Sequence, residues 1–189
     1  DHRYLHSFPT RRSSDLPKTT GDLKESEVEI LKKALEHPIL SNPLEALIRP
    51  NQKILLIVDD NSRPTPIYKM LPPLIGLFEK IGIQDNQISI LIALGTHRPM
   101  RQDEFDQKLG VSIASRFKVF NHEWNNPEAL YNYGTATDTS QVILNKAMKE
   151  ADFVIGLGSI TPHPAAGYTG GGKIIVPGVA TDQIGRAHV

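Results

Sequence analysis

Three apolar runs of strand length divide this chain, and each is followed at once by a polar or glycine-rich loop. The runs cover Lys53–Val58, Gln87–Leu94 and Asp152–Leu157. Unbroken apolar character over such a length is typical of a strand buried on both faces of a parallel sheet, and helical patterns lie between the runs. We therefore predict an α/β fold with a Rossmann-like, mainly parallel sheet flanked by helices.

Weaker patterns fill the intervals. A helix is predicted over Lys24–Glu36, and another from Thr65 to about Lys80, in which Pro72 and Pro73 should kink or restart the helix. The other predicted elements are a short helix at Asp103–Leu109, a brief strand at Phe117–Phe120, a short antiparallel excursion at Leu130–Asp138 and a strand running into a helix at Val142–Glu150.

Composition narrows the class of protein. The 189 residues include 21 basic and 21 acidic side chains and no Cys. Balanced charge argues against a nucleic-acid partner, and the lack of Cys excludes a disulfide scaffold and a Cys nucleophile. No run approaches the roughly 18 apolar residues of a membrane helix, and no secretory leader is present. We therefore expect a cytoplasmic protein with no membrane or nucleic-acid partner.

The two ends of the chain fit no fold pattern. Residues 1–16 match no secondary-structure period, and residues 184–189 break off in mid-pattern. Both resemble translated sequencing-adapter sequence, and a natural disordered tail is the alternative for the first. Excluding both, we predict one α/β domain over residues 17–183 that is truncated at its C-terminus, with artefactual tails at 1–16 and 184–189.

The loops that follow the three predicted strands contain the residues best suited to bind or convert a ligand. Residues 59–66, 95–99 and 158–173 follow them and contain charged, Gly and Pro residues. Because the carboxyl ends of parallel strands meet at one edge, and ligands bind outside that edge, we expect a shared crevice there.

The first loop contains Asp60 and Arg63. They could form an ordinary exposed ion pair, which contributes little. Arginine is nevertheless the side chain best suited to two-pronged recognition of a carboxylate or phosphate. We therefore interpret Arg63 as an anion-binding residue.

Two of the histidines are candidates for catalysis. His97 could be a solvent-facing loop residue, but a histidine at the mouth of a crevice is also a natural general acid or base. His163 shares the third loop with Lys173 and has a proline on either side. By contrast, His37 is predicted to cap a helix C-terminus, and His122 to be structural.

The glycine-rich stretch Gly167–Lys173 satisfies part of the phosphate-binding P-loop pattern. Ile174 stands where that motif needs Ser or Thr to ligate magnesium, so an ATPase fits poorly. Successive glycines could still let backbone N–H groups approach a phosphate, with Lys173 beside them; the alternative is a flexible loop with a solvated lysine. The residues by themselves indicate acid/base chemistry on a phosphorylated or anionic ligand.

Three motifs together resemble the nickel-pincer-nucleotide-dependent lactate racemase family, specifically its N-terminal domain. They are DDNSRPTP at 59–66, ALGTHRP at 93–99 and PHPAAGYTGGGKIIVPG at 162–178, in order and well spaced. The resemblance covers about residues 23–180. It implies an isomerase that racemises or epimerises a 2-hydroxy acid, with lactate as the default substrate, by hydride transfer to the cofactor.

The resemblance also implies roles for single residues. Lys173 would be joined covalently to the cofactor, a pyridinium thioamide/thiocarboxylate mononucleotide that carries nickel. His97 and His163 would be the acid/base pair, and Arg63 would hold the substrate carboxylate. The cofactor-binding residues expected on this basis are Lys173, Asp60, Thr96, Gly170, Gly171 and Gly172.

The chain departs from the family in one respect. The nickel-binding histidine of the family falls just beyond Gly178, and residues 179–183 contain no His, so no metal ligand is assigned and His188 in the suspect tail is left out. The partners expected are a small 2-hydroxy acid, the cofactor-synthesis enzymes and a C-terminal domain missing here. We expect this fragment alone to be inactive. The alternative is a non-catalytic nucleotide- or anion-binding module that uses the loop 167–173.

Overall fold

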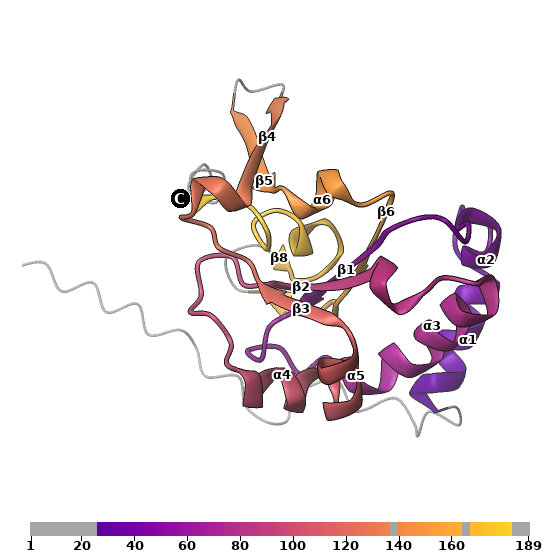
Figure 1. Ribbon diagram of the computed structural model, residues 1–189. Coiled ribbons are helices and arrows are strands. Elements are labelled where there is room, and N and C mark those ends of the chain that lie inside the picture. Colours follow the sequence, from indigo (N-terminus) through magenta and orange to yellow (C-terminus); the bar gives the residue numbers. More distant parts are fainter. Residues whose placement is uncertain (1–25, 137–139, 164–166, 183–189) are drawn as a thin grey trace, which may run out of the picture.

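A four-stranded parallel sheet forms the centre of the molecule (Figure 1). The computed structural model describes residues 26–136, 140–163 and 167–182, so the predicted tails lie outside the described residues and their boundaries stay predictions. The strands lie in the order β3-β2-β1-β6. Their bounds are β1 Ile54–Asp59, β2 Ile88–Ala93, β3 Lys118–Asn121 and β6 Phe153–Leu157, and all neighbours are parallel. The predicted α/β fold is confirmed.

One face of the sheet is covered by helices α3 (Ile67–Ile81), α4 (Gln102–Leu109) and α5 (Val111–Arg116). Helix α1 (Glu27–Glu36) packs on α3, and the short α2 (Leu44–Leu47) follows it. Alternate strand residues enter this core, because successive side chains point to opposite faces. They include Ile54, Leu56, Val58, Ile88, Ile90 and Ile92, all 3% exposed or less. Burial of each such side chain stabilises the fold by about 1.5–3 kcal/mol.

The opposite face has a smaller core. Leu55, Ile57 and Leu91 point to it and meet Val179, and the partly buried side chains of α6 (Ala147–Glu150) and of the turn after Lys173 pack around them. Strands β1 and β2 are therefore covered on both faces, as their uniform apolar character predicts.

Helix α3 runs through Pro72 and Pro73 as one continuous helix, so the predicted restart is wrong. The two prolines leave the carbonyls of Tyr68 and Lys69, in the first turn of the helix, without their usual N–H donors. Pro72 is exposed, whereas Leu71, Leu74, Ile75 and Phe78 form one buried stripe. Packing of that stripe outweighs the two lost hydrogen bonds.

One further prediction needs correction, and one helix was not predicted. Strand β6 is not buried on both faces: it lies at the sheet edge, and only Leu157 of its five residues is buried. Helix α5 was not expected, because its six residues follow Gly110 directly, and that glycine turns the chain with φ +87°. The antiparallel excursion is confirmed as a hairpin of β4 (Leu130–Thr135) and β5 (Gln141–Asn145), next to which residues 137–139 are outside the described part.

The strand order locates the crevice. The chain passes from β1 to β2 over the α3 face, but returns to β6, on the other side of β1, through α6 on the opposite face. The carboxyl ends of β1 and β6 thus form a topological switch point, where ligands bind in open α/β sheets.

Short elements complete the description: η2 Asp85–Gln87, η3 Pro127–Ala129, β7 Pro162–His163, β8 Gly167–Tyr168 and η4 Gly171–Ile174. Within the described ranges, no helix is long and apolar enough to cross a membrane.

Candidate active site

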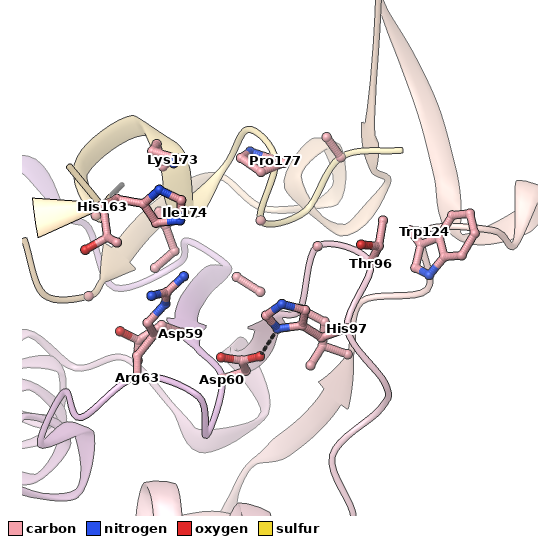
Figure 2. A pocket seen from close by; sticks show the side chains of 18 of the residues that line it. Asp59, Asp60, Arg63, Thr96, His97, Trp124, His163, Lys173, Ile174 and Pro177 are labelled. Carbon is pink, nitrogen blue, oxygen red and sulfur yellow. Dashed lines mark hydrogen bonds and ion pairs between the residues drawn. The ribbon is translucent and has the colours of Figure 1, made fainter. Parts of the chain in front are cut away.

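A cavity of about 580 Å³ opens at the carboxyl ends of β1, β2 and β6, where the sequence predicts it. Figure 2 shows His97 and His163 on opposite sides of this pocket in that view. Seven of the predicted site residues line it: Asp60, Arg63, Thr96, His97, His163, Gly170 and Lys173. Gly171 and Gly172 are not among the lining residues and lie exposed at the start of η4. The shared crevice is confirmed, and the roles of its residues remain predictions.

Asp60 holds the imidazole of His97. The aspartate is 4% exposed, and its Oδ2 lies 2.6 Å from His97 Nδ1 (Figure 2). Its Oδ1 accepts hydrogen bonds from the Ser62 backbone N–H at 3.1 Å and from Ser62 Oγ at 2.5 Å. Because an ionised carboxylate only accepts hydrogen bonds, Nδ1 of His97 carries the proton. In this tautomer Nε2 has the lone pair that a general base requires.

The guanidinium of Arg63 is available for a ligand. It is half-buried in the cavity wall, and in the part of the chain that the structure describes no side chain pairs with it. The nearby carboxylate of Asp59 is engaged elsewhere: it accepts a hydrogen bond from Thr65 Oγ1 and forms an ion pair with Lys108 at 2.8 Å. A partly buried arginine that has no side-chain partner among the described residues is suited to binding a carboxylate or phosphate through two parallel hydrogen bonds.

The third loop is folded back by Thr169. This buried residue donates its N–H to the Thr161 carbonyl at 2.8 Å, and its hydroxyl donates to the Ser159 carbonyl at 3.0 Å. The hydroxyl also accepts the N–H of Thr161 at 2.9 Å. These bonds close the short β7–β8 hairpin, so that His163 on β7 and Lys173 on η4 line the same cavity.

Lys173 lies in the wall of the pocket. Its backbone N–H is used in η4, where it donates to the Gly170 carbonyl at 3.1 Å. Among residues 26–136, 140–163 and 167–182, no side chain forms an ion pair or hydrogen bond with its Nζ. The amine is therefore open to a reactive or anionic ligand.

Two glycines serve the packing of this loop. A Cβ on Gly170, where φ is +71°, would lie 2.5 Å from the Ser159 carbonyl oxygen. A Cβ on Gly178 would lie 2.2 Å from the Ile174 carbonyl oxygen, and the Gly178 carbonyl accepts the Gly95 N–H at 2.8 Å. Close backbone approach is thus a role for these glycines that the phosphate-cradle interpretation did not include.

His37 and His122 have the structural roles predicted for them. His37 is the C-cap of α1, and its N–H donates to the Lys33 carbonyl at 2.8 Å. His122 is 1% exposed and lies between the Ala180 carbonyl, 3.0 Å from Nε2, and Asn145 Nδ2, 3.1 Å from Nδ1. Burial lowers the pKa of His122, so the ring is held neutral, with Nε2 donating and Nδ1 accepting.

Sequence reasoning missed part of the cavity wall. Trp124 and Ser159 line it, and Asp59, quoted only as part of a motif, does so too. Asp59 could have been predicted in the wall, because it directly precedes Asp60 at the end of an apolar run. Trp124 could not, because it follows β3 in a loop whose path the sequence does not specify. Within the described residues, no group of three or more His, Cys, Asp or Glu side chains is placed to hold a metal ion.

The fold and this cavity define an α/β domain with a pocket at the carboxyl edge of its parallel sheet, lined by both acidic and basic side chains. The chain belongs to the lactate racemase N-terminal domain family, which it matches over residues 5–189. It is 34% identical to the lactate racemase of Lactiplantibacillus plantarum and 35% identical to that of Thermoanaerobacterium thermosaccharolyticum. Each match covers 158 residues, or 84% of this chain.

Two solved structures resemble the fold. The lactate racemase apoprotein from Thermoanaerobacterium thermosaccharolyticum matches 84% of this chain with a TM-score of 0.78 and 34% identity. A protein from Thermotoga maritima matches 73% with a TM-score of 0.63 and 29% identity. The chain spans 37% of the length of the two lactate racemases in sequence, and 38% and 37% of the two solved chains.

Proposed function

We propose that this domain is the cofactor-bearing part of a racemase or epimerase that acts on a 2-hydroxy acid, with lactate as the first substrate to test. The observation that carries the proposal is the arrangement of one cavity. Two histidines and an arginine reach it from three separate strand-end loops, and a lysine without a described partner lies in its wall. Membership of the lactate racemase N-terminal domain family supports the same reaction.

Arg63 would bind the carboxylate of the substrate, which fixes C1 and leaves the C2 hydroxyl to face the imidazoles. His97 is the better-defined base, because Asp60 fixes its ring and leaves Nε2 able to accept the hydroxyl proton. As the ring becomes an imidazolium, the buried carboxylate stabilises the new charge. His163 would perform the same transfer for the opposite enantiomer, so each histidine acts as base in one direction and as acid in the other.

The described residues fit the nickel-pincer nucleotide at its point of covalent attachment but not at its metal. Lys173 has an amine with no described partner in the wall of a 580 Å³ cavity, which is the chemistry that covalent attachment requires. A full ligand set for the metal is not formed by the described residues, so none is assigned here. When bound, the cofactor would supply the hydride acceptor and donor that side chains lack.

The test uses the full-length protein, produced together with the cofactor-making enzymes. L-lactate and D-lactate are incubated separately with this protein, and each should be converted into the other enantiomer. The hydrogen removed from C2 should be returned to C2 of the product. If no 2-hydroxy acid in a broad screen is inverted or exchanged at C2, the proposal is wrong. Reversible nucleotide binding without a covalent adduct on Lys173 would instead support the non-catalytic binding module.

A further inference from the structure

Helix α4 lies outside the cavity, yet it contacts two of the loops that form it. Glu104 and Lys108 are one helical turn apart on its buried side, each 7% exposed. A Glu and a Lys at this spacing usually pair with each other on a solvated helix face. Here neither does so, and neither lines the cavity.

Glu104 ties the β1 loop to the β2 loop. Its Oε1 accepts from Asn61 Nδ2 at 2.8 Å and from Arg98 Nη2 at 2.5 Å. Its Oε2 accepts from Arg98 Nη1 at 2.8 Å and from the Arg101 N–H at 2.8 Å. Asn61 directly follows Asp60, and Arg98 directly follows His97. The hydrogen bonds from Arg98 and then from the Arg101 N–H hold the pKa of Glu104 down to about 2, so the carboxylate stays ionised.

Lys108 braces the segment that carries Arg63. Its Nζ forms an ion pair with Asp59 Oδ1 at 2.8 Å and donates to the Arg63 carbonyl oxygen at 2.9 Å. The same segment is tied across the crevice, because Thr65 Oγ1 donates to Asp59 Oδ2 and accepts a hydrogen bond from Ser159 Oγ at 2.8 Å. The lysine therefore fixes both ends of the turn from Asp59 to Arg63.

We infer that Glu104 and Lys108 are positioning residues of the active site, Glu104 for the Asp60–His97 pair and Lys108 for Arg63. The inference rests on the proposed function. Stability alone does not explain these groups, since a buried ion pair can often be replaced by apolar side chains at no cost. Their bonds end on two loops of the cavity, whereas the apolar core beneath is complete without them.

The two residues should have separable kinetic signatures. Lys108→Met frees the Arg63 segment, so the KM for lactate should rise while kcat changes little. Glu104→Gln loosens the link between the loops, so kcat should fall while KM changes little. A displacement of about 1 Å in a reacting group can cost up to about 100-fold in rate, so we expect effects between about 10-fold and 100-fold.

Three variants separate positioning from stability. The double variant Asp59→Asn/Lys108→Met leaves no unpaired buried charge, so it should recover thermal stability relative to Lys108→Met but keep the raised KM. Lys80→Met removes an exposed lysine that pairs with Glu45, and Asp103→Asn removes an exposed carboxylate next to Glu104 on the same helix. Both controls should retain wild-type kinetics.

Two readouts do not depend on turnover. Calorimetry of L-lactate with the cofactor-free protein should show weakened binding in Lys108→Met, with Arg63→Met as reference. The ¹⁵N shift of His97 Nδ1 reports its hydrogen-bonded proton and should change in Glu104→Gln but not in Asp103→Asn. An inactive wild-type enzyme would refute the proposed function alone. Wild-type lactate affinity in Lys108→Met together with an unchanged Nδ1 shift in Glu104→Gln would overturn this inference.

Discussion

Asp60 Oδ2 lies 2.6 Å from His97 Nδ1, although the two residues are 37 positions apart and follow different strands. The aspartate side chain is 5% exposed and the histidine ring 56%. A buried carboxylate thus holds an imidazole whose other nitrogen is open to the cavity. This is the arrangement that selects one tautomer of a general base.

Asp60→Asn should therefore impair the enzyme more than the loss of one charge suggests. The amide group of the new asparagine would donate to Nδ1, where the carboxylate accepted. The ring would then carry its proton on Nε2, and Nε2 could no longer act as the base. We expect kcat to fall by about 100-fold or more, because general-base catalysis contributes about 10²–10⁴-fold. Steady-state kinetics with both enantiomers measures this. A kcat within threefold of wild type would show that the pair is not part of the reaction.

His97→Ala and His163→Ala should each remove most of the interconversion while leaving the fold intact. Both side chains line the cavity from loops, outside the apolar core. The expected loss is about 10²–10⁴-fold, to be measured from each enantiomer, with circular dichroism confirming the fold. Near-full activity of either variant in both directions would contradict the two-base mechanism.

Lys173→Ala should abolish covalent cofactor attachment. Intact-protein mass spectrometry of the wild type, produced with the cofactor-making enzymes, should show an adduct, and the variant should show the bare mass. Lys146→Ala is a suitable control, since Lys146 is exposed and lies away from the cavity wall. An adduct that persists in Lys173→Ala would place the attachment on another residue.

The buried His122 should make stability depend on pH. Burial lowers its pKa below the ordinary 6.5, so below that pH the unfolded chain binds a proton that the folded protein does not. The free energy of unfolding should decrease as the pH falls below about 6.5, by at most about 1.4 kcal/mol per pH unit from this group. Denaturant titrations at pH 7.5, 6.5 and 5.5 measure the slope. It should be shallower in His122→Gln and unchanged in the exposed-site control His37→Gln.

Gly170→Ala and Gly178→Ala should destabilise the third loop. The new Cβ would meet a backbone oxygen at 2.5 Å and 2.2 Å respectively, and Gly170 also has a positive φ. We expect each to lower the free energy of unfolding by more than about 1 kcal/mol. Gly76→Ala is the matched control: nothing lies within 4 Å of its Cβ, and inside helix α3 it should stabilise by about 0.5–1 kcal/mol. Equal effects at all three positions would show that loop packing does not require glycine.

The sequence was sufficient to predict the sheet and the place of the cavity because these follow from local patterns. Apolar runs identify β1 and β2, and the parallel arrangement then brings their following loops together. Strand β6 has the same apolar pattern, but its edge position depends on the order of strands in space, which no local pattern contains.

The bracing of the site was not predictable in the same way. Glu104 and Lys108 have the spacing of an ordinary surface pair, and only the packing of α4 against two loops gives each another partner. Pro72 and Pro73 similarly follow a local rule for breaking a helix, which the buried stripe of α3 overrides.

Two hydrogen bonds connect the chain after β6, which carries His163, to the loops that follow β1 and β2. The Gly95 N–H donates to the Gly178 carbonyl at 2.8 Å, and Thr65 Oγ1 is hydrogen-bonded to Ser159 Oγ at 2.8 Å. The three loops of the cavity are thus held together by residues other than the two histidines and the arginine. Substitution at Thr65 or Ser159 should therefore loosen the β1 loop against the chain after β6 while leaving His97, His163 and Arg63 unchanged.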